Sequence, residues 1–192
     1  MIPHDDALAI LKQQIGDDDI VIAVYGTAVD WHALRPHPLN YFSVGAMGLT
    51  AAHGLGLALG CPDRRVIVID GDGSLAMSLG SLITVAGAAP KNFVHILWEN
   101  GVYQANGGHP LPARDKVDFA GLALAAGYRA AHRFDDAAIF AQQIGSVLQE
   151  EGPVFATVKI KANPFQKQDF APLRAQALRD AFKAALGTSK AS

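Results

Sequence analysis

The most informative part of the sequence runs from Val66 to Tyr103 and reads VIVIDGDGSLAMSLGSLITVAGAAPKNFVHILWENGVY. It opens with Val66–Asp70, a β-branched run with the length and composition of one buried strand. A segment with helical spacing follows, Leu75–Ala89, and Pro90 ends it because proline cannot continue a helix. A second apolar run, Phe93–Trp98, predicts the next strand. The stretch therefore predicts a strand–helix–strand unit of a parallel sheet.

A short polar turn follows each of these strands, Gly71–Ser74 after the first and Glu99–Tyr103 after the second. Two parallel strands joined by a crossover helix place the ends of both strands at the same edge of the sheet. Ligands bind at this carboxyl edge in open α/β sheets. We therefore expect the two turns to lie side by side at a ligand site.

The oxygen atoms in these turns suit a divalent metal ion. Asp72 offers a carboxylate, Asn100 a side-chain carbonyl and Val102 a backbone carbonyl. A few hard oxygens from the protein, completed by phosphate and water, are the ligands that Mg²⁺ prefers. The two turns together therefore predict a magnesium site.

The glycines of the first turn suggest an anion beside that metal. Gly71 and Gly73 lack a side chain, so their backbone can approach a ligand closely and adopt positive φ. Free N–H groups near Gly73 and Ser74, at the start of the following helix, attract an anion. A metal and an anion cradle together indicate a diphosphate. The alternative is an ordinary turn of a doubly wound domain, where Gly and Asp are common for steric reasons.

The rest of the chain continues the alternation of strands and helices. The further strands that we expect are Ile20–Tyr25, Tyr128–His132 and Val154–Ile160, and the further helices are residues 3–15, 45–59, 118–126, 136–149 and 172–186. The segment Trp31–His37 is expected to be a loop that either lines a substrate or subunit surface or only connects two elements. We expect one domain, residues 1–192, built as an α/β fold with a doubly wound, mostly parallel sheet and helices on both faces.

The composition excludes several classes of protein. The chain has 192 residues, half of them hydrophobic, and a formal net charge of −2. That length suits one α/β domain with a full core, and the near-neutral charge gives no reason to expect a nucleic-acid or membrane partner. Cys61 is the only cysteine, so no intrachain disulfide is possible. We expect a buried thiol at Cys61 and a cytoplasmic enzyme.

Two segments bear on targeting and membranes. Met1–Gly16 lacks the basic start and apolar centre of a signal peptide. Ser43–Gly60 is long, uncharged and apolar, but it contains several glycines and His53, and it is barely long enough for a membrane span. We expect it to form a buried helix packed closely on the sheet.

The two turns, with the helix and strand between them, resemble the thiamine diphosphate binding motif. Further matching text lies in Tyr41–Gly48 and in Gly107–Pro110. The family that the sequence resembles is the sulfopyruvate and phosphonopyruvate decarboxylases, and within it the subunit that carries the diphosphate-binding (PP-type) domain. The resemblance extends from about Asp18 to Lys161.

The resemblance implies roles for particular residues, in three groups. It implies metal ligands Asp72, Asn100 and Val102, cofactor-binding residues Gly45, Met47, Gly71, Gly73, Ser74 and Tyr103, and contacts to substrate or intermediate from Gln104 and His109. In the resembled family, the apolar residue at the position of Met47 lies under the cofactor and bends it. The carbonyl at the position of Gly45 receives the pyrimidine amino group there.

One residue of the resembled family is missing. In that family a glutamate on a separate pyrimidine-binding domain activates the cofactor. This chain has only Glu99, Glu150 and Glu151, and none of them is placed for that role. The chain is also too short for two such domains. We expect a second, pyrimidine-binding (alpha) subunit to supply the glutamate, with the cofactor at the subunit interface and the isolated chain nearly inactive.

The resemblance thus implies the β-type subunit of a thiamine diphosphate- and Mg²⁺-dependent decarboxylase. Its substrate would be a small 2-oxo acid of the sulfopyruvate or phosphonopyruvate kind. Gln104–Asn106 and His109 depart from the sulfopyruvate group, so a carboligase or lyase with the same cofactor stays an alternative. A non-catalytic nucleotide-binding module on a doubly wound sheet is the second alternative.

Overall fold

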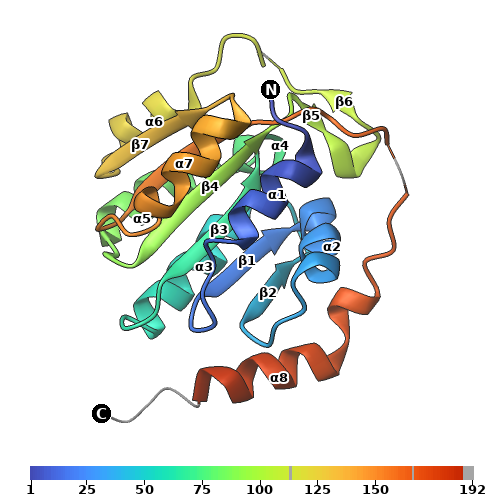
Figure 1. Cartoon of the computed structure of the whole chain (residues 1–192), viewed down its shortest axis with the longest axis vertical. Coiled ribbons are helices and arrows are strands. Elements are labelled where there is room, and N and C mark those ends of the chain that lie inside the picture. The colour runs from blue at the N-terminus through green and yellow to red at the C-terminus, as the bar shows by residue number, and fades with distance from the viewer. Residues whose placement is uncertain (113, 166, 188–192) are drawn as a thin grey trace.

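The computed structural model describes residues 1–112, 114–165 and 167–187, and its main feature is a six-stranded sheet in the order β2-β1-β3-β4-β8-β7 (Figure 1). The strands are β1 Ile20–Val24, β2 Asn40–Ser43, β3 Val66–Gly71, β4 Phe93–Glu99, β7 Ala130–Phe134 and β8 Val154–Lys159. Each neighbouring pair is parallel, so the carboxyl ends of these strands share one edge. A short antiparallel hairpin, β5 Val102–Tyr103 with β6 His109–Pro110, extends beyond β4.

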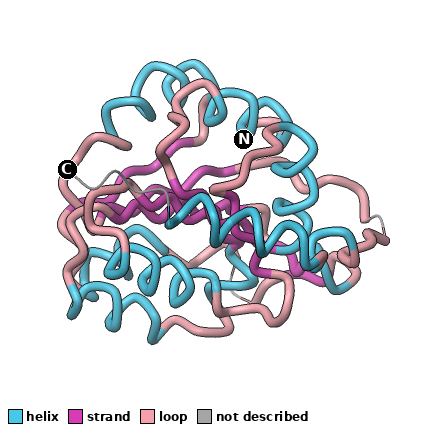
Figure 2. Tube along the Cα trace, turned by 90° about the horizontal axis from the view of Figure 1, so that it is seen from below, coloured by secondary structure: helices cyan, strands magenta, loops and turns pink. Residues whose placement is uncertain are grey.

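Helices cover both faces of the sheet, as Figure 2 shows. One face carries α1 His4–Lys12, α2 Tyr25–Leu34 and α7 Ala137–Val147, and the other carries α3 Thr50–Gly60, α4 Asp72–Ala76, α5 Gly80–Ala88 and α6 Phe119–Ala126. Two 3-10 turns, Gln104–Asn106 and Pro172–Arg174, and a last helix, α8 Gln176–Gly187, complete the fold. The buried Phe182 packs α8 against the second face. The predicted doubly wound parallel sheet is confirmed.

Strand β3 shows why the central strands are apolar over most of their length. Ile67 and Ile69 belong to the core cluster of one face, whereas Val66 and Val68 belong to the cluster of the other. Successive side chains of a strand point to opposite faces, and both faces are covered by helices. Each of these side chains is therefore buried.

Helix ends and one close contact match the sequence expectations. The side chains of Asp118 and Asp136 accept backbone N–H groups at the starts of α6 and α7, and Gly127 ends α6 with a φ of 110°. A Cβ at Gly54 would lie 2.3 Å from Val68 Cγ2, so α3 packs closely on the sheet, as expected. Within the ranges that the structure describes, no helix has the length and apolar character to cross a membrane.

The helix predicted over residues 75–89 is wrong as a single element. α4 ends at Ala76 and α5 begins at Gly80, with a turn between them. Ser78 and Gly80 are weak helix formers. In addition, Gly48 of the β2–α3 loop packs against Ser78, because a Cβ at Gly48 would lie 3.1 Å from Ser78 Cβ. Local propensity and this packing both favour the break.

The segment around Trp31 also differs from the prediction. Tyr25 begins α2 instead of ending β1, and the helix continues to Leu34, where a loop was expected. The Trp31 indole is fully buried and donates to Asn40 Oδ1 at 3.0 Å. The Arg35 side chain is buried as well. These side chains therefore belong to the core and not to a substrate or subunit surface.

Distant segments are joined at both edges of the sheet. At the carboxyl edge, Ile2 forms a parallel bridge with Ile160, which brings the start of the chain beside β8. At the opposite edge, Arg65 forms an ion pair with Asp19. Cys61, expected to be buried, is only half-buried and holds a free thiol at the end of α3, on this same opposite edge.

Candidate functional site

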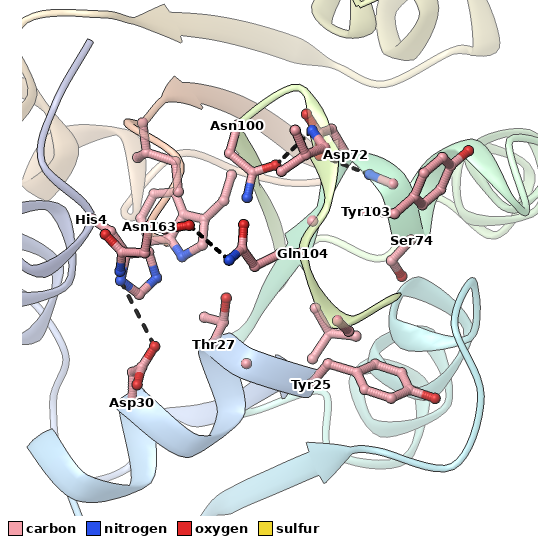
Figure 3. A pocket seen from close by; sticks show the side chains of 18 of the residues that line it. His4, Tyr25, Thr27, Asp30, Asp72, Ser74, Asn100, Tyr103, Gln104 and Asn163 are labelled. Atoms are coloured by element: carbon pink, nitrogen blue, oxygen red, sulfur yellow. Dashed lines mark hydrogen bonds and ion pairs between the residues drawn. The ribbon is translucent and has the colours of Figure 1, made fainter. Parts of the chain in front are cut away.

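A cavity of about 460 Å³ lies at the carboxyl edge of the sheet, beyond the ends of β1, β3 and β4 (Figure 3). After β1 the chain forms β2 on one side of β1 and then β3 on its other side. The strand order therefore changes direction here. Such a switch point is where open α/β sheets bind ligands. Both predicted turns line the cavity, together with the start of α2 and the segment after β8.

The acidic turn holds its carboxylate with backbone donors. Asp72 Oδ1 accepts from the N–H of Gly73 at 2.8 Å, and Asp72 Oδ2 accepts from the N–H of Gly101 at 2.7 Å. Burial raises the pKa of Asp72 from its ordinary value to about 6, although these hydrogen bonds oppose the shift. No ion pair to Asp72 occurs in the described ranges. A desolvated carboxylate of this kind suits a cation.

The amide turn is built around Asn100 and Gly101. Asn100 Oδ1 accepts from the N–H of Val102 at 3.0 Å, which folds the side chain over the turn. Gly101 has a φ of 72°, a conformation that favours glycine. In Figure 3 the Asn100 and Asp72 side chains lie next to each other on the same wall. The two turns form one polar surface, as predicted.

The glycines of the acidic turn do not act as predicted. Neither Gly71 nor Gly73 has a positive φ, so that part of the expectation is wrong. At Gly73 the constraint is contact, because a Cβ there would lie 2.6 Å from Tyr103 Cδ1. At Gly71 a Cβ would meet no atom within 4 Å and would enter the cavity. The missing side chains thus leave room for a neighbouring ring and for a ligand.

Ser74 joins the acidic turn to the loop before α3. Its hydroxyl accepts from the N–H of Gly48 at 3.0 Å and lies 3.5 Å from the Thr50 hydroxyl. This contact fixes the loop that carries Met47 into the cavity wall. Sequence reasoning named Ser74 for its backbone N–H, and it missed this use of the side chain.

The start of α2 forms a wall that the predicted residues did not include. Tyr25, at a φ of 40°, opens the helix, and Gly26 and Thr27 line the cavity. No side chain caps this helix end, so its free N–H groups are available to an anion. The Gly-Thr pair after the strand expected at Ile20–Tyr25 indicated that this turn lies at the ligand edge, although neither residue was among the predicted site residues.

The far wall comes from segments distant in the sequence. His4 Nδ1 lies 3.8 Å from Asp30 Oδ2, and burial raises the pKa of Asp30. Lys161 and Gln168 complete this wall, and Gln168 Oε1 would lie 2.9 Å from a Cβ at Gly26. No local pattern indicates His4 or Gln168, because tertiary contacts alone bring them here.

Most residues that the sequence singled out lie together. Nine line the cavity: Met47, Gly71, Asp72, Gly73, Ser74, Asn100, Val102, Tyr103 and Gln104. Gln104 Nε2 donates to the Asn163 carbonyl at 2.8 Å. Gly45 and His109, both among the described residues, are exposed and lie outside this cavity.

The donor set fits a single Mg²⁺ held with a phosphate. No group of three or more His, Cys, Asp or Glu side chains that could hold a metal occurs in the described segments. A magnesium site with one carboxylate, one amide and one backbone carbonyl needs no such group, since phosphate and water complete it. The uncapped start of α2 on the opposite wall offers N–H groups to that phosphate.

Comparison with known proteins shows which family this chain belongs to. Residues 24–158 match the family described as thiamine pyrophosphate enzyme, C-terminal TPP binding domain. The chain is 36% identical over 156 residues to phosphonopyruvate decarboxylase of Streptomyces viridochromogenes, which covers 81% of this chain and 39% of that protein. It is 37% identical over 146 residues to sulfopyruvate decarboxylase subunit beta of Methanothermobacter thermautotrophicus. That alignment covers 76% of this chain and 75% of that protein. The chain therefore spans about two fifths of the length of the phosphonopyruvate decarboxylases it matches.

Solved structures share the fold. Benzoylformate decarboxylase from Polynucleobacter necessarius superposes with a TM-score of 0.73 at 18% identity, over 86% of this chain and 34% of that one. The 4-hydroxybenzoylformate decarboxylase of Rhodococcus jostii RHA1 gives a TM-score of 0.72 at 23% identity, over 84% and 33%. At these identities the likeness supports the fold alone.

Proposed function

This chain belongs to the thiamine pyrophosphate enzyme family, and from that premise we propose that it is the β-type subunit of a thiamine diphosphate- and Mg²⁺-dependent decarboxylase. Its substrate is a small 2-oxo acid of the sulfopyruvate or phosphonopyruvate kind. The relatives with these names support the reaction class. The observation that carries the proposal is the shared wall of Asp72 and Asn100, which joins a buried carboxylate to an amide.

The metal belongs to the two turns in this proposal. The Asp72 carboxylate, the Asn100 side-chain carbonyl and the Val102 backbone carbonyl hold Mg²⁺. The buried Asp72 carboxylate has no positively charged partner among the described residues, and the bound ion supplies one. The N–H of Gly101 keeps the carboxylate oriented toward the second turn.

The diphosphate lies between the acidic turn and α2. The N–H groups of Gly26 and Thr27, at the uncapped start of α2, face it from one side. On the other side the N–H of Gly73 is not free as predicted, because it donates to the Asp72 carboxylate, and we place the N–H of Ser74 toward the diphosphate. Gly71 leaves space for it, since a Cβ there would meet nothing within 4 Å. Tyr103, packed on Gly73, closes the wall.

When bound, thiamine diphosphate supplies an electron sink for the electron pair left by loss of CO2. Met47 reaches the cavity from the β2–α3 loop and shapes the space for the rings. Gly45 offers its carbonyl from the exposed side of that loop, where a partner can cover it. Gln104 contacts the substrate from within the cavity, and His109 does so from the hairpin once the partner closes the site.

A second chain completes the enzyme in this proposal. A separate pyrimidine-binding (alpha) subunit supplies the activating glutamate, and residues 1–192 form one diphosphate-binding domain. Relatives named subunit beta support this arrangement. The free thiol of Cys61 is consistent with a cytoplasmic enzyme.

A carboligase or lyase with the same cofactor is the second candidate. Apart from Asp72, the charged side chains that line the cavity are the carboxylates Asp5 and Asp30, together with Lys161 and His4. A substrate with a second anionic group therefore gains little charge complementarity from the described part of this chain. A less charged substrate fits these walls equally well.

Calorimetric titration with thiamine diphosphate tests the cofactor site. We expect binding that requires Mg²⁺, and Asp72→Asn should weaken it at least about tenfold. Asp118→Asn is the control, because that carboxylate caps α6 outside the cavity. Binding to the wild type without any dependence on Mg²⁺ would contradict the metal site.

Product analysis tests the reaction. With the pyrimidine-binding partner present, a panel of 2-oxo acids should include at least one that releases CO2. Carbon–carbon bond formation between two substrates without release of CO2 favours the carboligase. No CO2 from any 2-oxo acid removes the decarboxylase assignment.

A further inference from the structure

A chain of buried polar groups runs behind the acidic turn, away from the cavity. The Tyr128 hydroxyl lies 3.3 Å from His95 Nδ1, and His95 Nε2 lies 3.5 Å from Asp70 Oδ2. The Asp70 carboxylate then accepts, through Oδ1, from the N–H of Gly71 at 2.9 Å. Exposures of 4% for Tyr128, 0% for His95 and 1% for Asp70 place the chain inside the core.

The surroundings of these groups are apolar. The His95 ring has Phe93 and Phe155 as edge-on neighbours, at centroid distances of 6.1 and 4.9 Å. Burying a carboxylate and an imidazole costs free energy unless they are well paired, and apolar replacements of similar volume are often neutral or stabilising. Stability alone therefore gives a weak reason for this trio.

The contacts indicate which nitrogen of His95 faces each neighbour. Burial and the nearby Asp70 charge raise the pKa of Tyr128, so its hydroxyl keeps its proton. When Nδ1 accepts from the Tyr128 hydroxyl, the ring proton lies on Nε2, which has no hydrogen-bond partner among the described residues and lies 3.5 Å from Asp70 Oδ2. The opposite tautomer would set an Nε2 lone pair against the Asp70 carboxylate, which is unfavourable.

The end of the chain is the backbone of the acidic turn. Asp70 fixes the N–H of Gly71, and the next residue is Asp72. Gly71 has no side chain, and a Cβ there would meet nothing within 4 Å, so side-chain packing does not hold this residue. Gly71 pairs with Trp98 in the β3–β4 ladder, and the Asp70 carboxylate adds the side-chain contact that orients the peptide leading to Asp72.

We propose that Tyr128, His95 and Asp70 are positioning residues for the metal-holding turn. Tyr128 orients His95, the His95 Nε2 atom lies against the Asp70 carboxylate at 3.5 Å and limits its position, and Asp70 sets the Gly71–Asp72 backbone in the geometry that binds the ion. This inference rests on the proposed function, since it takes the acidic turn as the metal site. Partners of this outer kind change metal affinity about 10–100-fold when they are removed from metal sites.

The test uses the full chain, thiamine diphosphate and Mg²⁺, with three readouts for each variant: cofactor affinity by calorimetry, unfolding in urea, and hydrogen exchange of the amides of residues 70–75 without ligand. Tyr128→Phe removes one hydroxyl and keeps the ring. His95→Leu removes both ring nitrogens, whereas His95→Gln keeps an N–H for Asp70. Asn92→Ala is the matched control for stability, because it removes three hydrogen bonds to backbone carbonyls at the opposite edge of the sheet.

We expect Tyr128→Phe to weaken cofactor binding about threefold to tenfold and His95→Leu at least about tenfold, with partial rescue in His95→Gln. Exchange at residues 70–75 should rise in Tyr128→Phe and His95→Leu but not in Asn92→Ala. If exchange in these variants rises only in proportion to lost stability, or the affinity stays at the wild-type value, the positioning role is overturned.

The ligand-free exchange measurement separates this inference from the function it rests on. If the wild type binds no cofactor, the proposed function fails. In that case faster exchange confined to residues 70–75 still supports a network that positions the turn. Unchanged exchange there overturns the network as well.

Discussion

The backbone N–H of Gly101 donates to Asp72 Oδ2 at 2.7 Å, which ties the tip of β4 to the tip of β3. The two residues are far apart in the sequence, yet one hydrogen bond makes their turns a single unit. Movement of either turn therefore changes the orientation of the carboxylate. The variants below test this unit and the core beneath it.

Substitution of Gly101 should damage the unit from the amide side. Gly101→Ala places a side chain on a φ of 72° and a Cβ 3.1 Å from Arg114 Cδ. The left-handed conformation costs about 1 kcal/mol in a residue with a Cβ. We expect the turn to relax away from Asp72 and the Mg²⁺-dependent affinity for thiamine diphosphate to fall about fivefold or more. Gly127→Ala is the control, because it strains a glycine at the end of α6 with a φ of 110°.

The raised pKa of Asp72 predicts how stability depends on pH. Its folded pKa of about 6 lies above the ordinary 3.8, so the folded state binds the proton more tightly than the unfolded state. The contribution is therefore present at low pH and is lost as pH rises from about 4 to 6, by on the order of 3 kcal/mol. Urea unfolding without ligand should show this loss in the wild type and not in Asp72→Asn. Identical pH profiles of the two proteins would contradict the assignment.

Metal binding should follow the opposite trend with pH. The ion needs the carboxylate, so the Mg²⁺ affinity should fall about tenfold for each pH unit below about 6. Calorimetric titrations at pH 5, 6 and 7 check this. A constant affinity over that range would show that Asp72 is not the group that titrates.

Two neighbouring glycines should respond differently to alanine. Gly73→Ala puts a Cβ 2.6 Å from the Tyr103 ring, and overpacking of this kind costs about 1–3 kcal/mol. Gly71→Ala meets no atom and keeps an allowed backbone, so its unfolding free energy should change by less than about 0.5 kcal/mol. Both should weaken diphosphate binding, Gly73→Ala by moving Tyr103 and Gly71→Ala by filling the cavity. Equal stability losses would argue against the contact with Tyr103.

A second glycine pair tests the packing of α3. Gly54→Ala forces a methyl group within 2.3 Å of Val68 Cγ2 and 2.9 Å of Phe93 Cε2, and we expect a loss of about 2–3 kcal/mol. Gly56→Ala faces open space on the same helix and should gain about 0.5–1 kcal/mol. Thermal unfolding of both variants measures the contrast. A stable Gly54→Ala protein would mean that α3 can move off the sheet.

The sequence was most informative where local chemistry decides the structure. The run Val66–Ile69 is apolar at every position because helices cover both faces of its strand, and this pattern is visible without a structure. The polar turns after β3 and β4 were also placed correctly, because neighbouring parallel strands end at the same edge of the sheet. Nine of the residues named from the sequence line one cavity as a result.

The rest of the site depends on contacts that no local pattern carries. His4 reaches the cavity because Ile2 pairs with Ile160, and Gln168 does so because its segment returns over Gly26. The start of α2 was misplaced because Tyr25 continues the aromatic and β-branched character of β1. The break between α4 and α5 depends partly on packing by Gly48, which comes from another element and adds to the weak helix propensity of Ser78 and Gly80.

The position of Cys61 has a practical consequence. The one thiol of the chain lies at the end of α3, and β3 leads from that edge of the sheet to Asp72 at the other. A maleimide dye attached there lies near the start of β3, whereas the cavity lies at the end of that strand. It offers a single, chemically unique reporter for measuring cofactor uptake and subunit association by fluorescence, without engineering a new attachment point.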